Sequence, residues 1–438
     1  MKQCYSIVRT LLVTPASALL LTAAVACGST PGTSDAPEET ASAAAQVQDS
    51  RRVTPGLEVL LRDSAHLVRG LRVGFLTNQS AVTSDGRSGI DLLHESPEVD
   101  LVALYGPEHG LRGGIEGGVE IDSEHDPATG LPVFSLYGQV QRPSPEMLEG
   151  VDVLLFDMQD IGARPYTFVW TMAMAIEAAA AEGIPFIVLD RPNPITGRSE
   201  GPVMEMEMRN VAQAITGYYP VPLRHGLTVG EVARYINSEY DIGADLTVVP
   251  ADGWVAAQWF DETGLPWIDP SPNIRSLEAA LNYAGLVLFE ATNLTVGRGT
   301  DAPFSYVGAP WLHTDRLLEQ LGAYDFEGVS LSPVELTPSG DGYVPFRGEQ
   351  VHAIQLSIND RDAYRPVETA LILLTEIRRL HPAEFEITNS GFTQMIGSLS
   401  DREAFESGED PQTIIGRWNE ELEEWSRLVE PYRLYPEG

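Results

Sequence analysis

Four clusters of polar residues, each following a short apolar run, could together form a site for acid–base chemistry. They are Asn78-Gln79-Ser80, Gly106-Pro107-Glu108-His109-Gly110, Asp157-Met158-Gln159-Asp160 and Asp190-Arg191-Pro192-Asn193. Asn, Asp, Gly and Pro also form ordinary turns, so any one cluster could be only a turn. Four clusters at successive strand ends instead indicate a shared ligand site, because open α/β sheets bind ligands beyond the carboxyl ends of their strands.

Glu108 is the leading candidate for a general acid. It lies in a turn stiffened by Pro107 and bordered by Gly106 and Gly110. This turn would direct the carboxylate of Glu108 and the imidazole of His109 into the shared site. The alternative for this glutamate is a salt bridge within its own loop.

The cluster after the fourth predicted strand supplies two more carboxylates. Asp157 and Asp160 could each serve as a second catalytic group, or could hold Arg164 or Arg191 in place. We expect the holding role for Asp157 and keep Asp160 as a catalytic candidate.

Missing residues disfavour several other chemistries. Lys2 is the only lysine, and the two cysteines, Cys4 and Cys27, both lie near the N-terminus. The rest of the chain therefore has no thiol nucleophile, cysteine metal site or Schiff-base lysine. We identify no serine nucleophile elbow and no His-Glu-x-x-His motif, which argues against serine hydrolases and zinc proteases.

No metal, nucleotide or nucleic acid is expected as a ligand. The acidic run 120–126 could bind a hard cation, but a solvated loop is the expected role of such a run. Gly297-Arg298-Gly299 lacks the further glycine of a dinucleotide-binding motif. A formal net charge of −35 argues against nucleic-acid binding, which needs clustered cations.

The N-terminus predicts export and a membrane anchor. A short basic region and the apolar run 11–25 indicate a signal peptide over residues 1–27. Small residues before Cys27 predict a lipoprotein, whereas Ala24 departs from the usual pattern and leaves plain secretion as the alternative. Residues 28–50 are rich in Ser, Thr, Ala, Pro and Glu and should form a disordered tether. We therefore expect a membrane-anchored protein in the periplasm or at the cell surface.

The apolar runs predict an α/β fold with a parallel sheet. Strands are predicted at 71–78, 99–106, 133–137, 151–157 and 184–190. A helix over 166–182, apolar around most of its circumference, should be buried against this sheet.

A second segment is predicted to start near residue 201. Thr228 and Glu231 have capping-box spacing and should begin a helix that runs to about Tyr240. Further elements are strands at 246–250, 286–290 and 352–358 and an amphipathic helix at 366–380. The length of the chain suits two domains. We expect a Rossmann-like catalytic domain over 51–200 and a second α/β domain over 201–438 that completes the cleft.

These motifs together resemble the exo-β-N-acetylmuramidase family of NamZ type. The four clusters extend to 76–80, 106–113, 157–164 and 189–194, and the other shared motifs are Arg224-His225-Gly226-Leu227-Thr228, Pro270-Ser271-Pro272-Asn273, Glu290-Ala291-Thr292-Asn293 and Gly297-Arg298-Gly299-Thr300. The resemblance covers nearly all of the chain after the tether. Pro165 and Ala291 depart from the residues that are usual there, an aromatic and a glycine.

The resemblance implies an exo-acting glycosidase of peptidoglycan that uses no metal or nucleotide. Its fold would be a Rossmann-like domain joined to a smaller α/β domain, with the active cleft between them. Its substrate would be the non-reducing-end N-acetylmuramic acid (MurNAc) of wall fragments, linked β-1,4 to N-acetylglucosamine (GlcNAc).

The catalytic pair is assigned from residue chemistry. Glycoside hydrolysis needs an acid to protonate the leaving oxygen and a second group at the anomeric centre. Glu108 is assigned as the acid, Glu290 as its leading partner and Asp160 as the reserve. The acetamido group of the sugar could itself be the nucleophile, so retention, inversion and substrate assistance all stay open.

An arginine is expected to recognise the lactyl carboxylate that distinguishes muramic acid, because a guanidinium binds a carboxylate through two parallel hydrogen bonds. The candidates are Arg164, Arg191 and Arg298. The other predicted substrate-binding residues are polar or aromatic members of the same motifs: Asn78, Gln79, His109, Gln159, Tyr166, Asn193, His225 and Asn293.

Aromatic residues near these segments could stack on sugar faces, although core packing is the expected role of any one of them. They are Tyr137, Tyr166, Trp170, Trp254 and Trp267. Two rival functions are a non-catalytic muropeptide-binding lipoprotein and an esterase or amidase of wall peptides, for which we identify no nucleophile. A pair of carboxylates in the cleft would favour the glycosidase, and a lone carboxylate among aromatics and arginines would favour the binding protein.

Overall fold

The computed structural model describes residues 52–113, 124–209, 215–388 and 391–438. The chain divides into two units, 1–47 and 48–438, and the described residues all belong to the second. Cys27, the predicted signal peptide and tether, and most of the acidic run lie outside the described residues. Those predictions therefore stay predictions.

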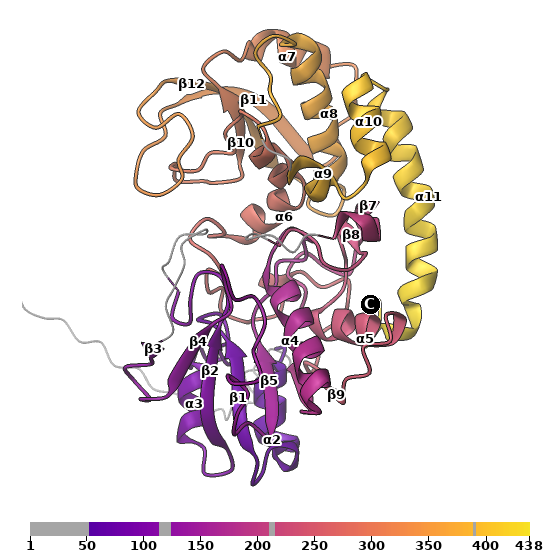
Figure 1. The fold of residues 1–438 in the computed structure, drawn as a ribbon. Helices are drawn as coiled ribbons and strands as arrows, with labels where there is room; N and C mark the ends of the chain where they lie inside the picture. Colours follow the sequence, from indigo (N-terminus) through magenta and orange to yellow (C-terminus); the bar gives the residue numbers. More distant parts are fainter. Residues whose placement is uncertain (1–51, 114–123, 210–214, 389–390) are drawn as a thin grey trace, which may run out of the picture. The chain divides into compact units, whose positions relative to one another are not determined.

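A seven-stranded sheet takes most of its strands from the first half of the chain (Figure 1). The strand order is β3-β4-β2-β1-β5-β6-β9, and the neighbouring strands are parallel except β3 with β4. The strands are β1 (Arg72–Thr77), β2 (Asp100–Gly106), β3 (Glu124–His125), β4 (Pro132–Ser135), β5 (Val153–Asp157), β6 (Phe186–Leu189) and β9 (Leu246–Val249). The predicted α/β fold with a parallel sheet is confirmed.

Helices cover both faces of this sheet, which explains why strands β5 and β6 are buried at every position. The helices are α2 (Gly56–Asp63), α3 (Gly89–Glu95), α4 (Phe168–Glu182) and α5 (Val229–Glu239). In β5, Val153 and Leu155 belong to the core that contains residues of α2 and α3. Leu154 and Phe156 belong to the core that contains residues of α4 and α5. The two-residue period of a strand thus places both sets in the protein interior.

Two helix predictions in this region are confirmed. α4 is buried around most of its circumference. α5 begins with a capping box, in which the Thr228 hydroxyl accepts from the backbone N–H of Glu231 and the Glu231 carboxylate accepts from the N–H of Thr228. These two backbone N–H groups at the start of the helix, which have no partner within the helix, are therefore hydrogen-bonded by neighbouring side chains.

The second half of the chain forms an antiparallel sheet covered by helices. Its strand order is β10-β12-β11. The elements are α6 (Leu277–Leu286), β10 (Tyr306–Ala309), α7 (Thr314–Leu321), β11 (Val329–Leu336), β12 (Val351–Ile358), α8 (Pro366–Leu380), α9 (Gly391–Ile396), α10 (Leu399–Ser407) and α11 (Pro411–Val429). α8 has the predicted bounds, and β12 begins one residue before its predicted start.

The strand predicted at 286–290 is wrong. These residues form the last position of α6 and most of a 3₁₀ helix, η4 (Val287–Ala291). Val287, Leu288 and Phe289 are all buried. A short apolar run buried on every side has no periodicity that separates a strand from a helix. Glu290 consequently projects from a helical turn and not from a strand end.

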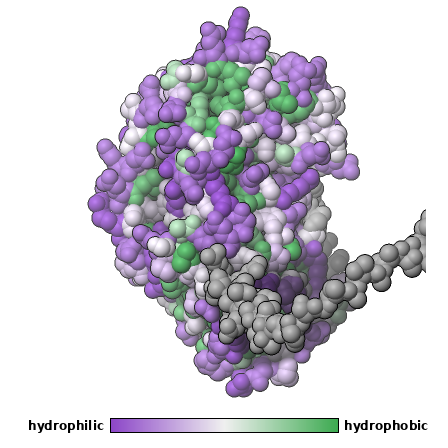
Figure 2. Space-filling view, turned by 180° about the vertical axis from the view of Figure 1, so that it is seen from behind, coloured by the Kyte–Doolittle hydropathy of each residue, from purple (hydrophilic) through white to green (hydrophobic). Residues whose placement is uncertain are grey.

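Elements beyond residue 200 contribute to both halves of the fold. β9 completes the parallel sheet, while β7 (Glu200–Val203) and β8 (Pro222–Arg224) pair with each other, and α8 and α11 contact β7. The division of domains at residue 200 stays a prediction. The face of the molecule in Figure 2 is largely hydrophilic, with smaller hydrophobic areas. Among the described helices, none is both long enough and apolar enough to cross a bilayer.

Candidate active site

A cavity of about 280 Å³ opens among the loops that follow β2, β4 and β5 and residues of the second half of the chain. Its lining residues are Glu108, His109, Tyr137, Pro165, Tyr166, Thr167, Thr216, Ser271, Asn273, Ile274, Tyr283, Val287, Glu290, Arg298, Phe304, Tyr343 and Met395. The two carboxylates ranked first from the sequence, Glu108 and Glu290, therefore line the same cavity. The fold brings them together from positions 182 residues apart (290 minus 108).

Glu108 lies in a turn with an unusual backbone. The N–H of Gly110 donates to the carbonyl of Pro107 and closes the turn. His109 has φ 70°, in the left-handed backbone region that residues other than glycine rarely adopt. Phe304, which also lines the cavity, has φ 62°. Such backbone conformations gather at functional sites, where the surrounding fold holds them.

The carboxylate of Glu108 is oriented by one hydroxyl. Thr167 Oγ1 donates to Glu108 Oε2 over 2.9 Å, and Thr167 is the residue that precedes α4. Since the bond engages Oε2, the other oxygen of the carboxyl group, Oε1, can carry a transferable proton. Glu108 is only partly buried, so its carboxyl group can be reached from the cavity.

Glu290 lines the cavity and forms an ion pair with Arg298. Arg298 Nε donates to Glu290 Oε1, and the two side chains are 17 % and 21 % exposed, Glu290 first. The Arg298 guanidinium also lies 5.4 Å from the centre of the Phe304 ring. The preceding residue must be a glycine, because Gly297 has φ 83° and a Cβ there would lie 2.6 Å from the Tyr306 ring. The ion pair thus fixes the position of the Glu290 carboxylate at the cavity wall.

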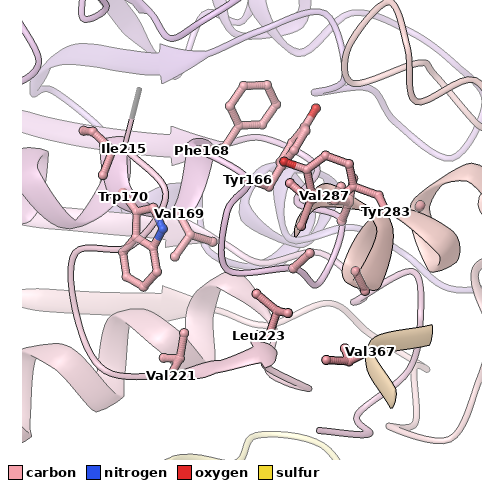
Figure 3. Close-up of a cluster of buried hydrophobic side chains, with 14 of the residues drawn as sticks. Tyr166, Phe168, Val169, Trp170, Ile215, Val221, Leu223, Tyr283, Val287 and Val367 are labelled. Carbon is pink, nitrogen blue, oxygen red and sulfur yellow. The ribbon is translucent and has the colours of Figure 1, made fainter. Parts of the chain in front are cut away.

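Two tyrosines form another part of the wall. The Tyr166 and Tyr283 rings meet edge to face with centroids 5.9 Å apart, beside Val287 (Figure 3). Burial raises the pKa of both phenols well above the usual value, and the negative charge of Glu108 raises it further. A phenol of this kind stays protonated at neutral pH. It is a poor nucleophile. The Tyr166 hydroxyl is itself buried, so Tyr166 contributes mainly its ring to the wall.

Asp160 lies in a buried network outside the described lining of the cavity. Its Oδ2 accepts from the N–H of Gly162 over 2.7 Å and lies 3.1 Å from His225 Nε2. His225 Nδ1 accepts from the N–H of Leu227, so a neutral imidazole carries its proton on Nε2 and donates it to Asp160. Asp160 and His225 are 5 % and 1 % exposed. Their contacts hold the loop that follows β5 against the loop that follows β8.

The holding role expected for Asp157 is confirmed. Arg191 binds the Asp157 carboxylate through Nε and Nη2, and Nη2 also donates to the carbonyl of Val82. Asp157 is fully buried and Arg191 is 4 % exposed. Arg191 is therefore bound inside the protein.

Arg164 is also bound inside the fold. Its guanidinium donates to the carbonyls of Pro202, Val221 and Met395, with donor–acceptor distances of 2.6–3.1 Å. Burial lowers the pKa of Arg164 to about 9. Of the three arginines predicted to bind the lactyl carboxylate, Arg298 is the one that belongs to the described lining of the cavity.

None of the five predicted substrate-binding amides is among the described residues that line the cavity, and four of them bond to other segments of the chain. Asn78 Oδ1 accepts from the N–H of Ser80. The other four donate to backbone carbonyls: Gln79 to Asp269, Gln159 to Pro192, Asn193 to Leu227 and Asn293 to Glu384. By contrast, His109 and Tyr166 line the cavity as predicted.

Several lining residues, above all Tyr283 and Tyr343, have no motif that marks them in the sequence. They lie in α6 and in the loop between β11 and β12, far along the chain from the polar clusters. Tyr283 sits in an apolar helical pattern typical of core positions, and Tyr343 has no distinguishing motif. Of the five aromatics considered, Tyr137 and Tyr166 line the cavity, Trp170 and Trp254 are buried, and Trp267 is partly buried.

Two alternative chemistries can be compared with the structure. Residues 197–201 read Gly-x-Ser-x-Gly, but Ser199 precedes strand β7 and not a helix, and its hydroxyl donates to the carbonyl of His225. This is not the geometry of a nucleophile elbow. Within the described part of the chain, no three His, Cys, Asp or Glu residues are grouped to hold a metal ion. Asp126, at the end of the acidic run, instead binds Arg112 and Thr129.

The chain is similar to members of one family in sequence and in structure. Residues 73–278 match the family described as exo-β-N-acetylmuramidase NamZ, N-terminal, and residues 281–435 match its C-terminal counterpart. The peptidoglycan β-N-acetylmuramidase NamZ of Bacillus subtilis (strain 168) is 40 % identical over 392 residues, which are 89 % of this chain and 93 % of the relative.

Two solved structures from Bacteroides fragilis NCTC 9343, both of DUF1343 family proteins, share the fold. BF0371 has a TM-score of 0.80 and 34 % identity, and the match covers 88 % of this chain and 99 % of that chain. BF0379 has a TM-score of 0.71 and 26 % identity over the same shares of the two chains.

Proposed function

Since this chain belongs to the exo-β-N-acetylmuramidase NamZ family, we propose that it releases MurNAc from the non-reducing ends of peptidoglycan fragments and that the cavity around Glu108 and Glu290 is its active site. The observation that carries the proposal is that these two carboxylates line one cavity. Its volume of about 280 Å³ is at the low end for small-molecule sites, which suits one terminal sugar better than the middle of a glycan strand.

Glu108 acts as the general acid in this proposal. The hydroxyl of Thr167 holds Glu108 Oε2, so the proton on Oε1 passes to the glycosidic oxygen as the bond to the leaving GlcNAc breaks. The breaking bond leaves positive charge at the anomeric carbon. A group at that centre must then stabilise the charge or attack the carbon. A water molecule finally supplies the hydroxyl group of the released MurNAc, and its proton restores the one that Glu108 gave up.

Glu290 is the proposed group at the anomeric centre. Arg298 pairs with its carboxylate and orients it, so Glu290 can stabilise the positive charge, attack the carbon, or orient the acetamido oxygen for attack. Asp160 ranks behind Glu290, because its carboxylate is buried against Gly162 and His225. Tyr283, as a protonated phenol, can donate to an oxygen of the sugar.

One assay separates this function from the muropeptide-binding alternative. The purified protein is incubated with a chromogenic β-glycoside of MurNAc and with its GlcNAc analogue. We expect rapid release of the chromophore from the MurNAc compound and slow or no release from the GlcNAc compound. A saccharide that ends in GlcNAc at its non-reducing end should resist cleavage. Tight binding of the MurNAc compound without turnover would contradict the proposal and favour the binding protein.

We also propose that the chain is an exported lipoprotein anchored through Cys27. The support is its position after an apolar run and small residues. In a cell that processes lipoproteins, Cys27→Ser should move the protein from the membrane fraction to the soluble exported fraction. Cys4→Ser, which changes the only other cysteine, is the matched control and should leave the protein in the membrane fraction. Unchanged membrane association of Cys27→Ser would overturn the proposed anchor.

A further inference from the structure

We propose that Tyr343 is a stacking platform for the leaving sugar, at the mouth of the cavity. This inference rests on the proposed function and names the residue that contacts the sugar beyond the scissile bond. Tyr343 lines the cavity from the loop between β11 and β12, residues 337–350. It would therefore help to select the glycan fragments that the active site accepts.

Its exposure sets Tyr343 apart from the rest of the cavity wall. Tyr343 is 67 % exposed, the largest fraction among the exposed large hydrophobic side chains of the described residues. The other aromatics of the wall, Tyr137, Tyr166, Tyr283 and Phe304, are at most 8 % exposed. Burying an aromatic ring is favourable, so an exposed ring that also lines a cavity offers apolar surface that a bound sugar can cover.

The loop that carries Tyr343 is fixed beside Arg298. The N–H of Ser339 donates to the carbonyl of Gly299 over 2.8 Å. A Cβ at Gly299 would lie 2.5 Å from both the Ser339 carbonyl oxygen and Val344 Cγ1, so the loop packs directly on this glycine. Tyr343 is thus one residue from a point of contact with the segment that holds Arg298.

A second aromatic shows how the loop is anchored. Phe346 packs partly buried against the main core, with its backbone in the left-handed region at φ 56°. The N–H of Glu349 donates to its carbonyl, and the N–H of Gly348 donates to the carbonyl of Pro338 across the base of the loop. The loop therefore buries one aromatic as an anchor and leaves Tyr343 in solvent, which a purely structural role for both rings does not explain.

The position of Tyr343 indicates that the sugar in contact with it is the leaving sugar. A single terminal sugar fills the enclosed part of the cavity, near Glu108 and Glu290, and the bond to be cut leads outward from Glu108. The next sugar must cross the exposed rim, where Tyr343 stands. One face of a pyranose presents C–H groups, which pack on an aromatic ring, while the phenol hydroxyl can reach the polar edge of the sugar.

The test compares Tyr343→Ala and Tyr343→Phe on substrates with and without a second sugar. The substrates are the disaccharide MurNAc-β-1,4-GlcNAc and the methyl β-glycoside of MurNAc. Tyr343→Ala should lower kcat/KM for the disaccharide about 10-fold, mainly by raising KM. The same substitution should change kcat/KM for the methyl glycoside by less than about 2-fold. Tyr343→Phe keeps the ring and should stay close to the parent. Leu399→Ala removes an exposed apolar side chain on α10 and should have no effect.

A binding measurement keeps the inference separate from the proposed function. In a Glu108→Gln background, Tyr343→Ala should weaken binding of the disaccharide about 10-fold and leave binding of free MurNAc unchanged. If the unsubstituted protein bound both sugars without hydrolysing the disaccharide, the proposed hydrolysis would be contradicted. The binding comparison would still test the stacking role of Tyr343. An equal loss of affinity for both sugars, or no loss of affinity for either, would overturn the role of Tyr343.

Discussion

Glu108→Gln should slow hydrolysis of the MurNAc-GlcNAc disaccharide by about 10²–10⁴-fold, the usual contribution of a general acid. The substitution keeps the size of the side chain and its acceptor for Thr167 Oγ1, and it removes the proton that Oε1 would transfer. The measurement is kcat on the disaccharide, with circular dichroism to show that the variant is folded.

The leaving group provides the control for this prediction. An activated aryl leaving group needs less protonation, so Glu108→Gln should spare the aryl glycoside of MurNAc relative to the disaccharide. Glu290→Gln should instead slow both substrates alike, because its carboxylate is proposed to act at the anomeric centre. A folded Glu108→Gln variant within about threefold of the parent on the disaccharide would rule out the acid role, since that is a barrier change of only about 0.65 kcal/mol.

Arg298→Gln should weaken recognition of MurNAc by roughly 10–150-fold, the effect of losing a charge-assisted hydrogen bond of about 1.5–3 kcal/mol. Arg298 lines the cavity with a guanidinium that can meet the lactyl carboxylate. GlcNAc has no lactyl group, so its binding should hardly change. The measurement is the ratio of the inhibition constants of MurNAc and GlcNAc against a chromogenic substrate.

The ion pair of Arg298 with Glu290 requires a matched comparison. Glu290→Gln breaks the same pair but keeps the arginine, so it should leave the ratio of the two inhibition constants in favour of MurNAc. Arg316→Gln, at an exposed position of α7, controls for the loss of one positive charge and should leave the ratio unchanged. Equal weakening of both sugars in Arg298→Gln would show that this arginine only holds Glu290.

The expected sizes of these effects follow from where the structure places each group. Glu108 and Arg298 both face the cavity, so removing their functional atoms changes the chemistry or the recognition of the sugar directly. Arg164 and Arg191 were equal candidates in the sequence. Their guanidinium groups bind backbone carbonyls and Asp157 inside the protein, so replacing them would test folding more than specificity.

The sequence by itself determined the features that depend on neighbouring residues. Apolar runs located the parallel strands of the large sheet, Thr228 and Glu231 located the start of α5, and Pro107 with its glycines marked the turn that carries Glu108. These signals are local, because strand period, capping and turn geometry each involve only a few consecutive residues. The long family motifs extended this to the class of enzyme.

Only the tertiary structure decided which polar residues face the substrate and which hold the loops. Asn78, Gln159 and Arg191 have the same polar character in the sequence as Glu108 and Arg298, yet their partners lie inside the fold. Tyr283 and Tyr343 reach the cavity from segments that carry no catalytic motif. Burial and partnership depend on contacts between distant parts of the chain, and no local pattern of residues encodes those contacts.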